Sequence, residues 1–441
     1  MSIQRPRGTR DIFGPNAKAW QWLESHIRHV CDLYGFGEIR IPIFEHTELF
    51  LRGVGETTDV VQKEMYTFDD KGGRSITLRP ELTAGVARAF IQHGMHSTPM
   101  PAKFFYTGPV FRYEAPQHGR LRQHHQFGVE SYGSAEPSVE AEVIAVGHSL
   151  LERLGVKGVT VYINSLGCSV CHGEYRGRLK DYVGGNLKKM CEDCRRRFEK
   201  NPLRALDCKV DTCKKVMDKA PSVIDTLDEE CLAHFQTLQE LLKGMGIAYE
   251  VNPKIVRGLD YYNRTVFEFM AEGLPTVIGG GRYDGLVEKV LGDPNDNAEK
   301  ILVDSNDNDK STVKTPSVGF GMGMDRLLML LDTQNLLPDS LANAPQIYIG
   351  HMGDAGYQKS QILVHELRRL DISAESDLLK RSVKAQMKYA DKIQAAYSLI
   401  IGGNEIEVGT AKLKNMGSGE QIDITLDAKE LEKEILKWAK A

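Results

Sequence analysis

The sequence has 441 residues, more than one hydrophobic core usually organises, so two or three domains are expected. Its composition of 41% hydrophobic and 26% charged residues, with a mean hydropathy of −0.33, is typical of a soluble protein. The net charge of −4 argues against a uniformly basic surface, although local basic faces would still be compatible with RNA binding.

The sequence predicts no membrane association, because its apolar runs are shorter than the roughly 20 residues of a membrane span. Residues 1–10 lack the apolar segment of a signal peptide, so a cytoplasmic location is expected. In a cytoplasmic chain, the eight cysteines favour metal binding or free thiols over a disulfide framework.

The first elements predicted are an amphipathic helix over 17–33 and a strand over 38–44 that contains Pro42. Proline favours a sheet edge, since no ladder donor is lost there. A helix followed by an edge strand suits either a dimer contact or plain surface.

A hairpin is predicted next, from strands 65–68 and 75–78, and it leads into a helix over 84–93. Glu81 and Thr83 lie at the start of this helix. There the helix dipole favours a carboxylate, and a hydroxyl can cap the helix. The alternative interpretation is that both residues contact a cationic amine of a ligand.

Residues 107–130 contain two alternating runs around a Pro/Gly-containing middle, which predicts an antiparallel hairpin with a long polar loop. Alternation would place Arg112 on a polar face, with Gln126 and Glu130 sharing a face on the return strand. The absent side chain of Gly128 would leave room for a ligand, so the hairpin is a candidate binding floor.

Beyond this hairpin, residues 168–229 become Lys/Arg- and Cys-rich with a helical pattern, which indicates an inserted helical module. A long strand is predicted over 255–269, and residues 293–315 predict a mobile surface loop. Strands and helices alternate after residue 346, which predicts an α/β domain with a mostly parallel or mixed sheet. The predicted plan is a core in two parts over 1–167 and 230–334, the insertion over 168–229, a linker over 335–345 and the last domain over 346–441.

Several arginines on separate polar or Gly-rich segments would converge if the hairpins share one sheet. Guanidinium forks bind phosphate oxygens bidentately, and nearby acidic and amide groups would form a negative pocket. A single arginine of this kind usually forms a surface ion pair. The predicted site for a polyphosphate and a cationic amine therefore depends on all of these residues occurring together. The arginines are Arg112, Arg120, Arg257 and Arg326, and the pocket residues are Glu81, Gln126 and Glu130.

These residues resemble the class II aminoacyl-tRNA synthetases, and most closely the histidyl-tRNA synthetase family, over nearly the whole chain. The segments similar to the three class II motifs are 37–42, 107–130 and 319–326. Those similar to histidine-specific signatures are Arg-Gly-Leu-Asp-Tyr-Tyr-Asn-Arg-Thr-Val-Phe-Glu at 257–268 and Gly-Gly-Arg-Tyr-Asp at 280–284, together with 77–84.

The resemblance implies an α+β multidomain fold, with an antiparallel-sheet catalytic core, a helical insertion and a C-terminal α/β domain like an anticodon-binding domain. It implies a homodimeric enzyme that activates L-histidine with ATP and Mg²⁺ and transfers it to tRNA(His). A regulatory paralogue that binds histidine without catalysis is the alternative. Such paralogues tend to lose the signature arginines and the C-terminal domain, and this chain keeps both.

The resemblance also implies residue roles. Arg112 would bind the α-phosphate, Arg326 the other end of ATP and Arg120 the outer phosphates, while Arg257 would lie at the reacting phosphate and carboxylate. Arg257, Arg112 and Arg326 are thus the predicted catalytic set. The implied histidine-binding residues are Glu81, Thr83, Gln126, Glu130, Tyr262, Tyr283 and Arg257.

Three positions depart from the family's pattern. Ala115 stands where many relatives carry arginine, in a loop expected to meet the tRNA acceptor end. Leu82 replaces a common glycine between Glu81 and Thr83, so the local backbone is expected to differ. Residues 293–315 are longer than the expected link and are interpreted as an insertion without function.

The inserted module carries cysteines at the C-x₂-C spacing of structural zinc sites, although the resemblance does not require zinc. The predicted ligands are Cys168, Cys171, Cys191 and Cys194. Cys208 and Cys213 could replace one pair. Two basic groups suit either tRNA contact or solvated surface: 195–197 with Lys200 and Arg204, and Lys380, Arg381, Lys384 and Lys388.

Overall fold

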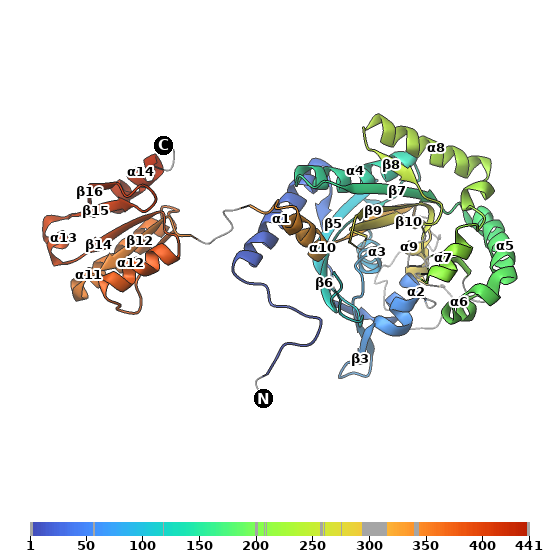
Figure 1. The fold of residues 1–441 in the computed structure, drawn as a ribbon, viewed down its shortest axis with the longest axis horizontal. Coiled ribbons are helices and arrows are strands. Elements are labelled where there is room, and N and C mark those ends of the chain that lie inside the picture. Colours follow the sequence, from blue (N-terminus) through green and yellow to red (C-terminus); the bar gives the residue numbers. More distant parts are fainter. Residues whose placement is uncertain are drawn as a thin grey trace. The chain divides into compact units, whose positions relative to one another are not determined.

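The protein is represented by a computed structural model. It describes residues 3–55, 58–117, 119–198, 202–206, 208, 210–255, 259, 261–274, 276–292, 315–338 and 344–438. Arg257 and residues 293–314 of the predicted surface loop lie outside these ranges. The chain divides into two compact units, one of Met1–Ile12 and Ala19–Pro338, the other of Phe13–Lys18 and Asp339–Ala441 (Figure 1).

An eight-stranded sheet forms the centre of the larger unit, in the order β1-β5-β6-β11-β10-β9-β7-β8 (Figure 1). Neighbours from β5 to β7 pair antiparallel, and only the edge strands β1 and β8 pair parallel. This confirms the predicted antiparallel core. The strands are β1 (Gly37–Glu38), β5 (Ala102–Phe111), β6 (Gln123–Tyr132), β7 (Val159–Ser165), β8 (Tyr249–Val251), β9 (Asn263–Ala271), β10 (Ile278–Arg282) and β11 (Ser317–Gly323).

Helices pack on this sheet and bury its apolar side chains. Helix α4 contacts β6, β10 and β11, and α10 contacts β6 and β11. A separate core joins α2, α3 and α9 to Tyr106, Tyr132 and Tyr283 of the sheet region. The helices of this unit outside the insertion are α1 (Pro15–Leu33), α2 (Thr47–Val54), η1 (Val60–Glu64), α3 (Thr83–Gln92), η2 (Met95–Ser97), α4 (Pro137–Arg153), α8 (Glu229–Gly244), α9 (Leu286–Leu291) and α10 (Met324–Thr333).

Two predicted strands differ from the structure. The single strand expected over 38–44 is wrong, because the chain divides around Pro42 between β1 and β2 (Phe44–His46), which belong to different sheets. β2 joins β4 (Ser75–Leu78) and β3 (Tyr66–Asp69) in a small antiparallel sheet. The strand expected over 255–269 begins only at Asn263, after a turn in which the Ile255 N–H donates to the Asn252 carbonyl at 3.2 Å.

The insertion between β7 and α8 forms short helices around a small core of its own (Figure 1). Its helices are α5 (Ser169–Asn186), η3 (Leu187–Lys189), α6 (Glu192–Arg197), η4 (Pro202–Ala205), α7 (Asp211–Met217) and η5 (Val223–Thr226). Helix α8 then returns to the core and packs on α4, where His234 Nε2 lies 2.8 Å from Glu140 Oε1.

The C-terminal unit has a mixed five-stranded sheet, as predicted from the alternating pattern, in the order β13-β12-β14-β15-β16. β12 pairs parallel with β13 and β14, and the remaining pairs are antiparallel. Its elements are β12 (Ile347–His351), α11 (Gly353–Arg368), β13 (Ala374–Ser376), α12 (Val383–Lys392), β14 (Tyr397–Ile401), α13 (Gly403–Val408), β15 (Thr410–Asn415), β16 (Gln421–Thr425) and α14 (Ala428–Trp438). Among the described helices, none is both long and apolar enough to cross a bilayer.

Candidate active site

A fully buried carboxylate, Glu130 of β6, lies at the centre of the larger unit's polar site. The Tyr106 hydroxyl donates to its Oε1 at 2.9 Å, and the Tyr283 hydroxyl donates to its Oε2. Burial raises the pKa of Glu130 to about 8, and the negative charge of Glu81 acts in the same direction. Hydrogen bonds from Tyr283, Thr83 and Tyr106 oppose this increase in pKa.

Two glycines shape the space around this carboxylate. Tyr106 of β5 pairs with Gly128 of β6, and a Cβ on Gly128 would collide with the Tyr106 phenol and lie 2.6 Å from the Phe320 carbonyl. The prediction that Gly128 leaves room for a ligand is therefore wrong, since Tyr106 fills that room. A Cβ on Gly319 of β11 would likewise overlap the Glu130 carboxylate.

A second buried carboxylate, Glu81, lies at the entry of α3. Its Oε2 accepts from the Thr83 N–H at 2.7 Å and its Oε1 from the Ala84 N–H at 2.9 Å. Burial raises the pKa of Glu81, while these hydrogen bonds and the charge of Arg112 lower it. The carboxylate thus caps the helix, and each oxygen keeps a lone pair for a cationic ligand.

Leu82, which replaces the family's common glycine, needs no special backbone geometry. Its φ of −108° and ψ of −24° are in the right-handed region, and its side chain is buried in the core of α2, α3 and α9. A glycine is therefore not required at this position of this chain.

Three tyrosine rings pack together beside the carboxylates. The ring centroids of Tyr261 and Tyr262 are 4.6 Å apart, those of Tyr261 and Tyr283 are 5.4 Å apart, and those of Tyr262 and Tyr283 are 6.2 Å apart. The sequence prediction named Tyr262 and Tyr283 but missed Tyr261. Burial raises the pKa of Tyr261 well above its usual value, and the charges of Glu81 and Glu130 add to the effect.

The predicted phosphate-binding arginines begin immediately after β5, which ends at Phe111. The prediction that Arg112 lies on a strand face is therefore wrong, because Arg112 lies in the loop that follows β5. Its Nε donates to the Pro80 carbonyl at 2.8 Å, next to Glu81. Arg120 lies further along the same loop, and its NH1 pairs with Glu114 Oε2 at 3.1 Å.

Arg326 in the first turn of α10 completes this group of arginines. Its Nε donates to the Gly119 carbonyl at 3.0 Å and its NH1 to the Thr276 carbonyl at 2.8 Å. Burial lowers the pKa of Arg326, and the positive charges of Arg120 and Arg112 add to that effect. Three guanidinium groups that repel one another in a partly buried place would be stabilised by a polyanion.

His124 on β6 is a further member of this site that the sequence prediction missed. Burial lowers its pKa to about 3, and the charges of Arg112 and Arg326 contribute. The imidazole is therefore neutral at physiological pH and adds no charge to the arginine group.

Gln126 of β6 has a glycine beside it on each neighbouring strand. It pairs with Gly108 on β5 and with Gly323 on β11, and a Cβ on Gly321 would lie 3.9 Å from its amide nitrogen. Its side chain is half-buried and lies on the same strand as Glu130.

A buried arginine, Arg79, fixes the segment that carries Glu81. Its Nε donates to the Pro109 carbonyl at 2.8 Å, and its NH1 donates to the carbonyls of Ile41 at 2.8 Å and Pro42 at 3.1 Å. The segment before α3 is thereby linked both to β5 and to the chain between β1 and β2.

In the Gly-Gly-Arg-Tyr-Asp stretch at 280–284, Arg282 supports the local fold and Tyr283 contacts Glu130. Arg282, fully buried, contacts the Glu140 carboxylate and donates to the Ser134 carbonyl and to Asp284 Oδ1, both at 3.0 Å. These contacts fix the end of β10, so that Tyr283 can reach Glu130. Arg257, the remaining predicted catalytic residue, lies outside the described residues.

The four cysteines predicted as zinc ligands do not form one cluster. Cys168 and Cys171 lie with Asp228 and Cys231, whereas Cys191 and Cys194 lie with Cys208 and Cys213. The predicted ligand set is therefore corrected. The chain spacing matched a common motif, but the folding of the insertion separates the two pairs.

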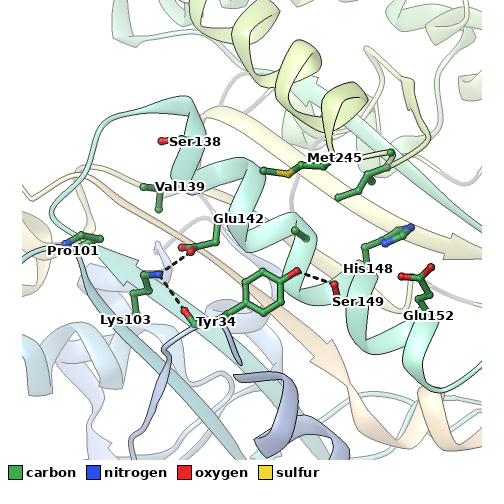
Figure 2. A pocket seen from close by; sticks show the side chains of 13 residues that line it. Tyr34, Pro101, Lys103, Ser138, Val139, Glu142, His148, Ser149, Glu152 and Met245 are labelled. Atoms are coloured by element: carbon green, nitrogen blue, oxygen red, sulfur yellow. Dashed lines mark hydrogen bonds and ion pairs between the residues drawn. The ribbon is translucent and has the colours of Figure 1, made fainter. Parts of the chain in front are cut away.

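A surface cavity of about 740 Å³ lies elsewhere on the larger unit, and none of the predicted site residues that the structure describes lines it (Figure 2). Lys103 Nζ donates there to Glu142 Oε1 at 2.7 Å and to the Tyr34 carbonyl at 3.1 Å. The Tyr34 hydroxyl and Ser149 Oγ are 2.8 Å apart. This cavity is separate from the carboxylate and arginine site.

The basic group predicted in the C-terminal unit is only partly free to bind a ligand. Arg381 pairs with Asp377 and lies over the Tyr389 ring at 4.1 Å, so it supports the local fold. The other members of the group are exposed: Lys380, Lys384 and Lys388.

The antiparallel sheet of the larger unit matches the core of the class II aminoacyl-tRNA synthetases. The family model described as histidyl-tRNA synthetase matches residues 8–299, and the one described as anticodon binding domain matches residues 346–438. The chain belongs to the histidyl-tRNA synthetase family.

Curated relatives agree with this assignment over the full length. A histidine–tRNA ligase of Acetivibrio thermocellus is 48% identical over 431 residues, covering 97% of this chain and 98% of the relative. One of Clostridium perfringens is 48% identical over 433 residues, covering 98% and 99%. The crystal structure of apo S. aureus histidyl-tRNA synthetase is 35% identical, with a TM-score of 0.79, and the match covers 98% of this chain and 99% of that one.

Proposed function

We propose that this chain is a histidine–tRNA ligase. It activates L-histidine with ATP to histidyl-adenylate and pyrophosphate, and then transfers histidine to the 3′ end of tRNA(His). The observation that carries this proposal is the pair of buried carboxylates, Glu81 and Glu130, beside three converging arginines in a chain of this family.

The carboxylate pair selects the amino acid. Two buried acidic groups whose pKa values are raised by burial favour a cationic partner, and the ammonium and imidazole of histidine offer one or two positive charges. A site with fixed polar groups rejects analogues that lack the matching groups by about 10⁴-fold or more, so no editing step is required. The proposed histidine-binding residues are Glu81, Thr83, Gln126, Glu130, Tyr262, Tyr283 and Arg257.

The arginine group holds ATP. Arg112 contacts the Pro80 carbonyl, next to Glu81, and its charge acts on Glu81, so it would bind the α-phosphate, which histidine's carboxylate attacks. Arg120 and Arg326 would bind the remainder of ATP, and Arg257 the reacting phosphate and carboxylate. Catalysis of this kind requires positioning and stabilisation of developing charge, which fixed guanidinium groups supply.

Magnesium would arrive on the phosphates of ATP, because Mg²⁺ is usually held by substrate oxygens, water and one or two carboxylates. Glu114 fits this pattern, since its carboxylate lies beside Arg120 and contributes to the charge environment of Arg326. Bound there, the ion would neutralise phosphate charge.

Amino-acid-dependent ATP–pyrophosphate exchange tests the enzyme directly. Histidine alone should support exchange, and Arg257→Ala should abolish it while the far-UV circular dichroism spectrum stays unchanged. Arg74→Gln is the matched control, because Arg74 lies in an exposed turn paired with Asp70. Tight histidine binding without exchange would instead favour the regulatory paralogue.

The tRNA is proposed to contact three parts of the chain. The C-terminal domain, residues 346–441 after the linker 335–345, would bind the anticodon. The loop 115–121 of the catalytic core (1–167 and 230–334) would meet the acceptor end, and the insertion 168–229 would contact the tRNA body. Ala115 is exposed in that loop and offers no charge to the acceptor end.

A homodimer is proposed through the small sheet and the edge beside it. Ile43, Phe44 and Phe68 are large apolar side chains that are 45%, 58% and 49% exposed there. Exposed apolar groups gathered on one surface often mark a protein interface. Phe44→Glu should convert a dimer to a monomer in light scattering, whereas the C-terminal Leu436→Glu should not. The proposed location is the cytoplasm, where its tRNA substrate is found.

A further inference from the structure

The insertion contains a cluster of four thiols from different segments. The sulfur atoms of Cys191, Cys194, Cys208 and Cys213 all lie within 4.8 Å of one another. Cys191 Sγ and Cys208 Sγ are 3.8 Å apart, far beyond the about 2.05 Å of a disulfide bond. The eight cysteines are all free thiols.

These distances match those around a tetrahedral metal ion. A zinc–sulfur bond of about 2.3 Å places two thiolates of a tetrahedral site about 3.8 Å apart. Packing in an apolar core alone does not require four sulfur atoms to lie within 4.8 Å of one another. Since all four positions would be filled by protein, the site would be structural and closed to substrate.

A second cluster has three thiols and one carboxylate. Cys168 Sγ and Cys171 Sγ are 3.7 Å apart, and Asp228 Oδ2 lies 3.3 and 3.1 Å from them. Cys231 is the fourth member of this group. The other carboxylate oxygen, Asp228 Oδ1, accepts from the Cys231 N–H at 2.7 Å, which orients Oδ2 toward the thiols.

Backbone donors support the sulfur atoms in both clusters. The Cys191 N–H donates to Cys213 Sγ at 3.1 Å, and the Asp228 N–H donates to Cys171 Sγ at 3.2 Å. The Cys168 N–H donates to Cys231 Sγ at 3.3 Å. Such contacts fix the orientation of the sulfur atoms.

We propose that the insertion binds two Zn²⁺ ions, one at Cys191, Cys194, Cys208 and Cys213 and one at Cys168, Cys171, Asp228 and Cys231. Both sites combine two short-spaced pairs, as structural zinc sites do. This proposal uses only residues of the insertion and its junction with α8, and it does not depend on the proposed enzyme function.

The two ions stabilise different parts of the insertion. The four-cysteine site lies within the module's own core, which contains Cys194 and Cys213. That core is small, and small domains often depend on a metal for stability. The second site joins the two places where the chain crosses between core and insertion, since Cys168 follows β7 and Asp228 precedes α8.

Metal content of the full-length protein, purified without chelator, tests the proposal. Mass spectrometric metal analysis should find two zinc ions per chain in the wild type. Cys208→Ser and Cys231→Ser should each retain one, because each removes a ligand from a different site. Cys31→Ala is the control and should retain two, since Cys31 is a buried thiol of α1 outside both clusters.

A second measurement covers variants that fail to fold. Titrating the wild type with an organomercurial in the presence of a zinc-sensitive dye should release two equivalents, and Co²⁺ loaded in place of Zn²⁺ should show thiolate-to-metal absorption. Zinc below about a tenth of an equivalent would overturn both sites, because closed sites of this type bind zinc tightly. A single equivalent that is lost in Cys208→Ser and kept in Cys231→Ser would overturn the junction site. If the protein purified without chelator supports exchange but contains no zinc, the zinc proposal is overturned and the enzyme function stands.

Discussion

The Tyr106 phenol fills the space above Gly128 on the neighbouring strand, and its hydroxyl donates to Glu130 Oε1 at 2.9 Å. One side chain thus supports the sheet and presents the pocket's central carboxylate. Because Tyr283 donates to the other oxygen, two phenols hold both oxygens of the Glu130 carboxylate in position.

Removing the Glu130 charge should impair histidine binding specifically. Losing one partner of a buried charge pair costs about 2–5 kcal/mol, so Glu130→Gln should raise the histidine KM in exchange by at least about 30-fold. The ATP KM should change little. Tyr106→Phe removes one hydrogen bond and keeps the charge of Glu130, so it should raise the histidine KM only about 5-fold. Equal effects on both substrates would contradict a histidine-specific role.

Histidine binding should release a proton at neutral pH. Burial raises the pKa of Glu130 to about 8, so its carboxyl is mostly protonated at pH 7 in the unliganded protein. A bound ammonium favours the carboxylate, so affinity should fall as pH drops below about 8, by up to about tenfold per unit. Calorimetry in buffers of different ionisation enthalpy measures the release, and Glu130→Gln corrects for histidine's own titration. Equal release by the variant would contradict the assignment.

Protonation of Glu130 has the opposite consequence for stability. A folded-state pKa above the unfolded value means that this group stabilises the fold fully below the unfolded pKa. That contribution is lost as pH rises through about 8. Saturating histidine should therefore increase the melting temperature more at pH 8.5 than at pH 6.5.

The ATP site should depend on Arg326. A charge-assisted hydrogen bond contributes about 1.5–3 kcal/mol, so Arg326→Gln should raise the ATP KM by about 10- to 150-fold. The histidine KM should stay within a few-fold, because Arg326 contacts Gly119 and Thr276 rather than the carboxylate pair. Arg74→Gln serves again as the control. A comparable rise in its ATP KM would show that the effect is not specific to Arg326.

Gly128→Ala should destabilise the core. The added Cβ would collide with the Tyr106 phenol and a backbone carbonyl, and overpacking of this kind costs about 1–3 kcal/mol. Gly185→Ala is the matched control, because nothing lies within 4 Å of its added Cβ in helix α5. Urea unfolding of the two variants gives the comparison, and equal midpoints would show that the Tyr106 region can relax.

Local periodicity was sufficient to predict the hairpins, the helical insertion and the mixed C-terminal sheet, whereas the antiparallel core as a whole was implied by the resemblance to the class II family. Local periodicity failed where two distant segments meet. Tyr106 was missed because only the hairpin's register places it opposite Gly128. Arg112 was placed on a strand because alternation continues past Phe111, where pairing with β6 ends.

The predicted zinc ligands show the same limit. The interval between Cys171 and Cys191 matched a familiar spacing, but helix α5 occupies that interval and its length separates the pairs. The signal that could have found the second set is Asp228-x₂-Cys231, which has the same spacing as a C-x₂-C pair with a carboxylate in one position. A search restricted to cysteines could not recover it.

The three carbonyl contacts of Arg79 link the segment 79–82 directly to residues 41–42 and to residue 109. Residues 43 and 44 belong to the proposed dimer surface, and Glu81 belongs to the proposed histidine pocket. A shift of one subunit against the other would therefore displace residues 43 and 44. Through Arg79, that displacement would move Glu81, two residues further along the chain, in the amino-acid pocket. Dissociation of the dimer should in this way silence catalysis even though every catalytic side chain is still present.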